Sequence, residues 1–355
     1  MSAPLPRIMH VDSGRSWRGG QRQVLLLATG LHDRGYRTLV VAPAGSPLIQ
    51  RAERAGLPTY RLTLRGEWDI RRARELRAVA KEWRADVIHA HDARAHSIGL
   101  LAQLFKRKAR LVVTRRVAFP PRRVRLKYRW GVDAFIAISE AVRKAMVNAG
   151  VADDRIQMVY SGVPAPQVRQ PRDWRRERGW PDDTVVCGIV GAMTREKGLD
   201  SIGAIASRLP PEVLSRTRLV LLGAKGKGET SISGLEVFDA GFVGEIHEAV
   251  AGLDLLWHPS RSEGLGTAVI DAMAVGITPI AFAVGGIPEV IEDDKSGMLV
   301  APGDLDGFAA AVTRLVTGDA LRVRLAAGAR LRAREFDSAA MIERTAEVYN
   351  RVTSG

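Results

Sequence analysis

The chain has 355 residues, of which 46% are hydrophobic and 26% charged. At about 150 residues per domain this length predicts two domains, and the composition excludes a disordered or fibrous chain. No apolar run approaches the roughly 18 residues needed to span a bilayer, and the first residues lack the apolar core of a signal peptide, so we expect a cytoplasmic protein. The single cysteine, Cys187, allows no internal disulfide, and its apolar surroundings predict a core position.

The net charge of +14 is concentrated in one half of the chain. Residues 1–165 carry 31 basic and 13 acidic side chains, whereas residues 166–355 carry 22 and 26. Residues 93–132 contain twelve lysines and arginines and no acidic residue. Such a basic block suits an anionic membrane surface, a phosphorylated acceptor or nucleic acid, and it is also compatible with a merely solvated face.

Short aliphatic runs alternate with amphipathic stretches along the first half. The amphipathic stretches predict helices at residues 21–33 and 70–83. Strands separated by helices form βαβ units, which predicts a parallel sheet. The predicted strands of this half are residues 8–11, 38–41, 86–89, 110–114, 134–138 and 156–159.

A second alternating series predicts another doubly wound sheet after a linker near residues 161–166. We therefore predict an α/β protein with two Rossmann-like domains, residues 1–165 and 166–337, and a final helix within residues 338–355. The predicted strands of the second domain are residues 184–190, 218–222, 254–257 and 278–281. The expected buried positions of the final helix are Met341, Ala346, Val348 and Tyr349.

In each domain, one glycine-containing turn follows the first predicted strand. Gly19 and Gly20 precede a predicted helix, so backbone amides there can approach a phosphate or a sugar oxygen; a plain tight turn is the alternative. In the second domain, Arg195 and Lys197 follow Gly191. Two cations on one turn can converge on a diphosphate without a metal ion, although an exposed charged turn has the same sequence.

The segment at residues 259–273 carries the strongest chemical signal. Glu263 precedes a glycine-containing turn and a helix, and Asp271 lies about 7 Å along that helix, a span similar to that of a pyrophosphate. Carboxylates accept hydrogen bonds from two hydroxyls at once. A capping box between Ser260 and Glu263 is the structural alternative. The residues whose amides face an anion at this helix start are Gly264, Leu265, Gly266 and Thr267.

These motifs resemble glycosyltransferase family 4, whose hallmark is Glu, seven residues and Glu in a Pro-Ser-x-x-Glu-Gly-x-Gly context. Glu263 and Asp271 match its spacing, and further similarity extends over nearly the whole chain, including residues 86–91 and 285–289. The resemblance implies the GT-B fold, in which two domains with parallel sheets face a central cleft. It also implies that the final helix crosses back to the first domain.

The implied activity is transfer of a sugar from a nucleotide-diphosphate donor, with a UDP-sugar favoured, retention of configuration and no metal or other cofactor. By resemblance, Glu263 binds sugar hydroxyls, Asp271 binds the ribose, and Lys197 with Arg195 neutralises the leaving diphosphate. The implied catalytic residues are thus Glu263, Lys197 and Arg195. The implied donor-binding residues are Gly19, Gly20, Gly191, Arg195, Lys197, Val243, Glu263, Gly264, Leu265, Gly266, Thr267 and Asp271.

Three positions depart from the family pattern. Asp271 stands where the family has Glu, and Ala192 stands where many members have Arg. At residues 114–116 the chain has Thr-Arg-Arg where many relatives carry a sugar-contacting His. We therefore consider Arg115 and Arg116 as contacts of an anionic acceptor or phosphate, together with His91, for which a structural role is the alternative.

The expected acceptor is a lipid-linked saccharide or a cell-envelope glycan such as lipopolysaccharide or capsule, reached by peripheral binding to the cytosolic membrane face. A nucleic-acid partner is disfavoured because few aromatic residues interrupt the basic block. No His or Cys cluster in the sequence suggests a metal, and Asp304 and Asp306 are expected to open a helix. A GT-B sugar epimerase, a soluble glycan synthase and a non-catalytic scaffold remain alternatives.

Overall fold

The computed structural model describes residues 4–104, 108–120, 127–223, 226, 228–244 and 246–354. The chain divides into two compact units, one formed by Met1–Gly162 with Ser338–Gly355 and the other by Val163–Asp337. We predicted a boundary at residue 165; the division in the structure falls between Gly162 and Val163. None of the described helices is long and apolar enough to cross a membrane.

The first unit contains a parallel sheet in the order β3-β2-β1-β4-β5-β6-β7. The order reverses between β1 and β4, so the sheet is doubly wound, and all six predicted strands are present. The short strand β3 was not predicted, because it has no aliphatic run: Thr59 and Tyr60 are partly buried and Arg61 is exposed. The strands are β1 (Arg7–Val11), β2 (Arg37–Ala42), β3 (Thr59–Arg61), β4 (Val87–Ala90), β5 (Arg110–Arg115), β6 (Ala134–Ala137) and β7 (Ile156–Met158).

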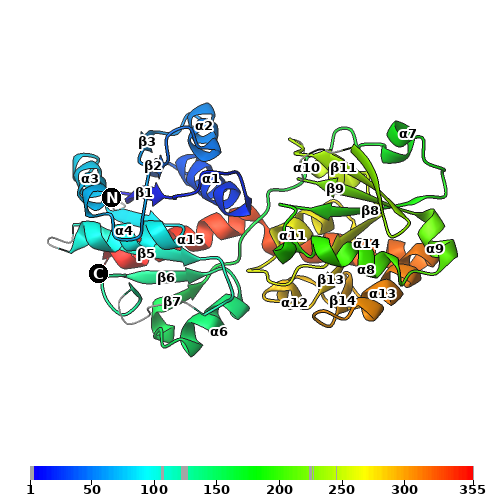
Figure 1. Ribbon diagram of the computed structural model, residues 1–355. Helices are drawn as coiled ribbons and strands as arrows, with labels where there is room; N and C mark the ends of the chain where they lie inside the picture. The colour runs from blue at the N-terminus through cyan, green and yellow to red at the C-terminus, as the bar shows by residue number, and fades with distance from the viewer. Residues whose placement is uncertain are drawn as a thin grey trace. The chain divides into compact units, whose positions relative to one another are not determined.

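Two helices distant in sequence, α1 and α15, pack together on this unit (Figure 1). Leu27 and Leu31 of α1 meet the buried side of α15 over Val87 and Val112 of the sheet, and the four predicted buried positions of α15 are all buried. Burial of each large aliphatic side chain contributes about 1.5–3 kcal/mol. The described helices are α1 (Gly19–His32), α2 (Pro47–Arg54), α3 (Ile70–Glu82), α4 (Ala93–Gln103), α6 (Glu140–Asn148) and α15 (Ser338–Ser354).

The second unit contains a sheet in the order β10-β11-β9-β8-β12-β13-β14. The predicted parallel sheet is present, except that the edge strand β10 runs antiparallel to β11. Strands β10, β11 and β14 were not predicted. The two-residue connection Ser233-Gly234 has positive φ at both positions, the geometry of a tight antiparallel hairpin. The strands are β8 (Val185–Val190), β9 (Thr217–Leu222), β10 (Gly228–Ile232), β11 (Leu235–Gly241), β12 (Leu255–His258), β13 (Thr278–Phe282) and β14 (Met298–Val300).

The core of the second unit joins the sheet to its longer helices. Trp257 and Phe282 contact Phe308 edge-on, and Cys187 is buried among them, as predicted. The Asp304 carboxylate accepts a hydrogen bond from the Gly307 amide at 2.8 Å, which confirms the predicted helix start. The helices are α7 (Trp174–Arg178), α8 (Ile202–Ala206), α9 (Pro211–Arg216), α10 (Ile246–Ala251), α11 (Thr267–Ala274), α12 (Ile287–Val290), α13 (Leu305–Thr317) and α14 (Asp319–Ala333).

Candidate functional site

Three loops meet at the carboxyl edge of the second sheet, after the neighbouring strands β8, β12 and β13. The loop after β8 approaches the loop after β12 so closely that a Cβ on Gly198 would lie 2.0 Å from the Pro259 carbonyl oxygen. The Arg261 amide also donates a hydrogen bond to the Glu196 carbonyl at 2.8 Å. Glycine at position 198 therefore permits the contact that brings the Lys197 turn beside Glu263.

The loop after β13 contacts the same segment through a second glycine. A Cβ on Gly285 would lie 1.8 Å from the Glu263 carbonyl oxygen, and Gly285 has φ +55°. Both the contact and the backbone conformation exclude a side chain here. The glycines at positions 198 and 285 thus fix the backbone that carries Glu263.

Glu263 is buried between two basic side chains. Its Oε1 lies 2.7 Å from His258 Nε2 and accepts a hydrogen bond from Lys197 Nζ. Burial opposes ionisation of this carboxyl, but the charges and hydrogen bonds of His258 and Lys197 outweigh burial and hold the pKa of Glu263 well below its usual range. The group is an anion at neutral pH, paired with the lysine that the sequence assigned to diphosphate binding.

Helix α11 begins directly after this loop. Gly266, its N-cap, has φ +92° and makes no side-chain cap, and no acidic residue lies in the first turn that starts at Thr267. Leu265 is buried, and a Cβ on Gly266 would lie 2.4 Å from Ile287 Cδ1. No carboxylate therefore neutralises the positive end of the helix dipole at the start of α11, and this suits an anionic ligand.

The alternative capping box between Ser260 and Glu263 is absent. The Ser260 hydroxyl lies 3.2 Å from His258 Nε2, and the Glu263 carboxylate contacts His258 and Lys197. Glu263 therefore precedes α11 as a side chain of the loop, as the site interpretation predicts.

Asp271 is buried in α11 and has a partner that the sequence did not reveal. Its Oδ1 lies 3.0 Å from His247 Nε2, on the neighbouring helix α10. The shorter carboxylate at the position where the family has Glu is thus held by an imidazole. This contact gives Asp271 a fixed orientation.

We expect His247→Ala to weaken binding of a nucleotide about tenfold, because Asp271 loses the hydrogen bond that orients it. His247→Gln, whose amide can still donate to the carboxylate, is expected to retain binding. Titration of each variant with the nucleoside diphosphate that the wild-type chain prefers measures this. Equal affinity for the Ala and wild-type chains contradicts the role.

Of the remaining predicted donor-binding residues, Gly191 lies near Lys197, whereas Arg195 and Val243 lie apart from Glu263 in their contacts or strand position. A Cβ on Gly191 would lie 3.7 Å from Lys197 Cε, so these two residues are close. The Arg195 side chain is 81% exposed and pairs with Asp200 at 3.3 Å. The structure thus places Arg195 with Asp200, whereas Lys197 pairs with Glu263. Val243, half-buried, follows β11, which is separated from β8 by β9.

In the first unit, the neighbouring strands β1 and β4 bring together a histidine cluster formed by His10, His89 and His91. Ring nitrogens of all three lie within 4.8 Å of one another, so the cluster offers three ligand atoms to a metal ion. His89, however, already contacts Tyr349 Oη at 2.5 Å and Thr114 Oγ1 at 2.6 Å through its two nitrogens. Burial lowers the pKa of His10 to about 3 and lowers those of His89 and His91, so the cluster is uncharged at neutral pH.

The two candidate arginines differ in their surroundings. Arg115 donates hydrogen bonds to the Tyr128 hydroxyl and the Phe119 carbonyl, and so it holds the segment after β5. Arg116 lies beside the start of α1, where a Cβ on Gly20 would be 3.7 Å from its Cδ. Burial lowers the pKa of Arg116 to about 10, which leaves it charged at neutral pH. The structure therefore brings Arg116, and not Arg115, to Gly20; exposed Gly19 is the first residue of α1, which we predicted to begin at residue 21.

Sequence reasoning missed His258, His247 and His10. His258 directly follows the predicted strand at residues 254–257, five residues before Glu263, and the structure makes it the last residue of β12. Its place at a strand end on the carboxyl edge was a usable signal. His247 is separated from Asp271 by a strand and a loop, and His10 meets His91 only through sheet order. No local sequence pattern predicts either contact.

Comparison with known proteins agrees with this architecture. The model described as Glycosyltransferase Family 4 matches residues 17–165, and the model described as Glycosyl transferases group 1 matches residues 170–332. The crystal structure of Anabaena HepE in complex with UDP-glucose is similar, with a TM-score of 0.84 and 22% identity over 98% of this chain and 100% of that one.

Curated relatives are similar over part of the chain. A D-inositol 3-phosphate glycosyltransferase of Stackebrandtia nassauensis is 32% identical over 56% of this chain and 49% of its own length. The sulfoquinovosyl transferase SQD2 of Arabidopsis thaliana is 28% identical over 66% of this chain and 50% of its own. The chain spans about half the length of these curated relatives. With family models matching both units and a fold shared with glycosyltransferase structures, the chain belongs to the family 4 glycosyltransferases and has the GT-B fold.

Proposed function

We propose that the second unit binds a nucleotide-diphosphate sugar and that the protein transfers this sugar, with retention of configuration, to an acceptor bound by the first unit. The observation that carries the proposal is the pairing of Lys197 with Glu263 directly ahead of the α11 start. The similar HepE structure is a complex with UDP-glucose, which supports a donor of this class.

The chemistry of this site suits departure of a diphosphate. When the bond between sugar and phosphate breaks, negative charge grows on the phosphate and positive charge on the sugar ring. In the proposal, Lys197 and the amides at the start of α11 stabilise the diphosphate, and Glu263 accepts hydrogen bonds from sugar hydroxyls. Asp271, oriented by His247, receives the ribose. These protein charges supply the stabilisation, so the proposal requires no metal ion.

For the acceptor we propose an anionic saccharide or glycolipid in contact with Arg116 and the neighbouring Gly20. The first unit is strongly basic, and a curated relative is named for an inositol phosphate. Each basic side chain near an anionic leaflet contributes about 1 kcal/mol, so we propose peripheral binding to the cytosolic membrane face that weakens with salt. Part of the basic block lies outside the described residues: Lys106, Arg107, Arg122, Arg123 and Arg125.

The proposed donor site is tested by thermal unfolding with UDP, GDP, ADP, CDP and dTDP, each in EDTA. One nucleotide is expected to raise the free energy of unfolding by about 3 kcal/mol at a hundredfold excess over its Kd. The shift should shrink in Lys197→Ala and Glu263→Ala and persist in Arg208→Ala, an exposed control. Absence of a shift with every nucleotide overturns the proposal.

A further inference from the structure

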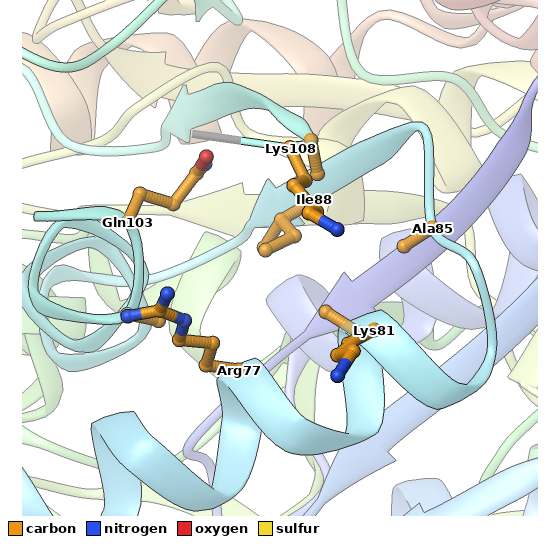
Figure 2. A pocket seen from close by; sticks show the side chains of 9 residues that line it. Arg77, Lys81, Ala85, Ile88, Gln103 and Lys108 are labelled. Atoms are coloured by element: carbon orange, nitrogen blue, oxygen red, sulfur yellow. The ribbon is translucent and has the colours of Figure 1, made fainter. Parts of the chain in front are cut away.

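A pocket of about 260 Å³ lies in the first unit, away from the residues discussed so far. It is bounded by the carboxyl-terminal parts of α3 and α4 and by residues at the beginnings of β4 and β5 (Figure 2). Arg116, Gly20 and the histidine cluster belong to the carboxyl edge of the same sheet, where ligands of such folds bind. The pocket is therefore at the opposite, amino-terminal edge.

Three cations line this pocket. Arg77 and Lys81 are four residues apart on α3, and Lys108 precedes β5. Like charges four residues apart repel each other and destabilise the helix, and a bound anion would offset this repulsion. Among the described residues, none of the three has a carboxylate within 4 Å.

Two acidic side chains close in sequence to the lining residues have other partners. The Asp86 carboxylate accepts a hydrogen bond from the Arg7 amide at 2.8 Å, and Glu75 pairs with Arg72. No acidic residue lines the pocket. Within the part of the chain that the structure describes, the lining of the pocket is therefore basic, and its cations form no ion pair.

Gln103 supplies a second, independent sign of a ligand. Its side chain lines the pocket from the end of α4, and the residue is only 6% exposed (Figure 2). Neither its amide nitrogen nor its amide oxygen has a hydrogen-bond partner among the described residues. A buried amide without partners is costly and rare in native proteins, and a ligand with hydroxyl groups satisfies both atoms.

We propose that this pocket binds a phosphate ester of a small polyol. The phosphate lies among Arg77, Lys81 and Lys108, and a neighbouring hydroxyl contacts Gln103. Alanines and Ile88 form the apolar remainder, which suits a short carbon chain. The volume is below the roughly 300–1,000 Å³ typical of sites for drug-sized ligands. The inference does not depend on the proposed transfer activity.

Two sources can supply this chemistry: a free polyol phosphate or the headgroup of an anionic phospholipid. The first probe is sn-glycerol 3-phosphate, titrated into the full chain by calorimetry. The second is a vesicle of phosphatidylcholine with about 30% phosphatidylglycerol, compared with pure phosphatidylcholine in co-sedimentation. Saturable binding in the first arm identifies a free ligand, and binding in the second arm alone identifies a lipid.

The test variant combines Arg77→Ala and Lys81→Ala. The matched control combines Arg71→Ala and Arg74→Ala, which removes equal charge from exposed positions of the same helix. The pocket pair is expected to weaken binding at least about tenfold, and the control less than about twofold. Gln103→Leu is expected to weaken binding while leaving the ligand-free protein equally or more stable, since it removes an unpaired buried amide. Equal effects of both pairs, or no binding of either probe, overturn the proposal.

Discussion

Replacement of Lys197 by alanine is expected to lower turnover by about 10²–10³-fold, or roughly 3–4 kcal/mol in the transition state. Lys197 donates to buried Glu263, and in the proposed reaction it faces the departing diphosphate. Its charge is therefore needed most when the phosphate becomes more negative. The measurement is the rate of nucleoside diphosphate release from the nucleotide sugar that binds best.

Two further variants make this prediction specific. Lys197→Arg keeps the positive charge and is expected to recover part of the rate. Arg195→Ala is expected to have a small effect, because Arg195 is exposed and pairs with Asp200. A loss in Arg195→Ala as large as that in Lys197→Ala shows that ligand binding recruits both cations. Unchanged turnover in Lys197→Ala refutes its role.

Gly285→Ala is expected to destabilise the second unit by roughly 2–5 kcal/mol. Alanine at positive φ costs about 1–2 kcal/mol, and overlap with neighbouring atoms adds about 1–3 kcal/mol. Its Cβ would lie 1.8 Å from the Glu263 carbonyl oxygen, so the variant must displace the loop that carries Glu263. Chemical denaturation followed by tryptophan fluorescence measures the loss.

Gly303→Ala is the matched control for this variant. Gly303 also has positive φ, +79°, but nothing lies within 4 Å of its added Cβ. Only the conformational cost is expected there. Equal destabilisation by the two substitutions indicates that the approach to Glu263 is not what requires glycine at position 285. Nucleotide affinity should also fall in Gly285→Ala and remain in Gly303→Ala.

Strands that are continuous aliphatic runs, such as β5 and β8, were predictable from sequence because nearly all of their side chains are buried. Four strands without such a run were not predicted: β3 and β14 have only three residues, β10 is exposed over most of its length, and β11 alternates buried positions with exposed or partly buried ones. The antiparallel direction of β10 follows from the Ser233-Gly234 turn, which local pattern alone did not single out.

In the candidate site, too, some residues were predictable from sequence and their contacts were not. Glu263 and Lys197 were identifiable because each stands in a distinctive turn after a strand. Their contact depends on β8 and β12 being neighbours, which sheet order decides. The orientation of Arg195 toward Asp200 and the approach of His247 to Asp271 depend on tertiary packing, and sequence spacing does not encode them.

The placement of α15 has a consequence for the order of synthesis and folding. Residues 338–354 cover the sheet of the first unit, yet they are translated after the whole second unit. At about 5–20 residues per second, a ribosome needs roughly 10–40 s to pass from Gly162 to Met341. During this interval the apolar surface beneath α15 and the polar partner of Tyr349, His89, remain uncovered. The unit that begins first is therefore completed last, and a nascent chain stalled before residue 338 presents a surface for chaperones to bind.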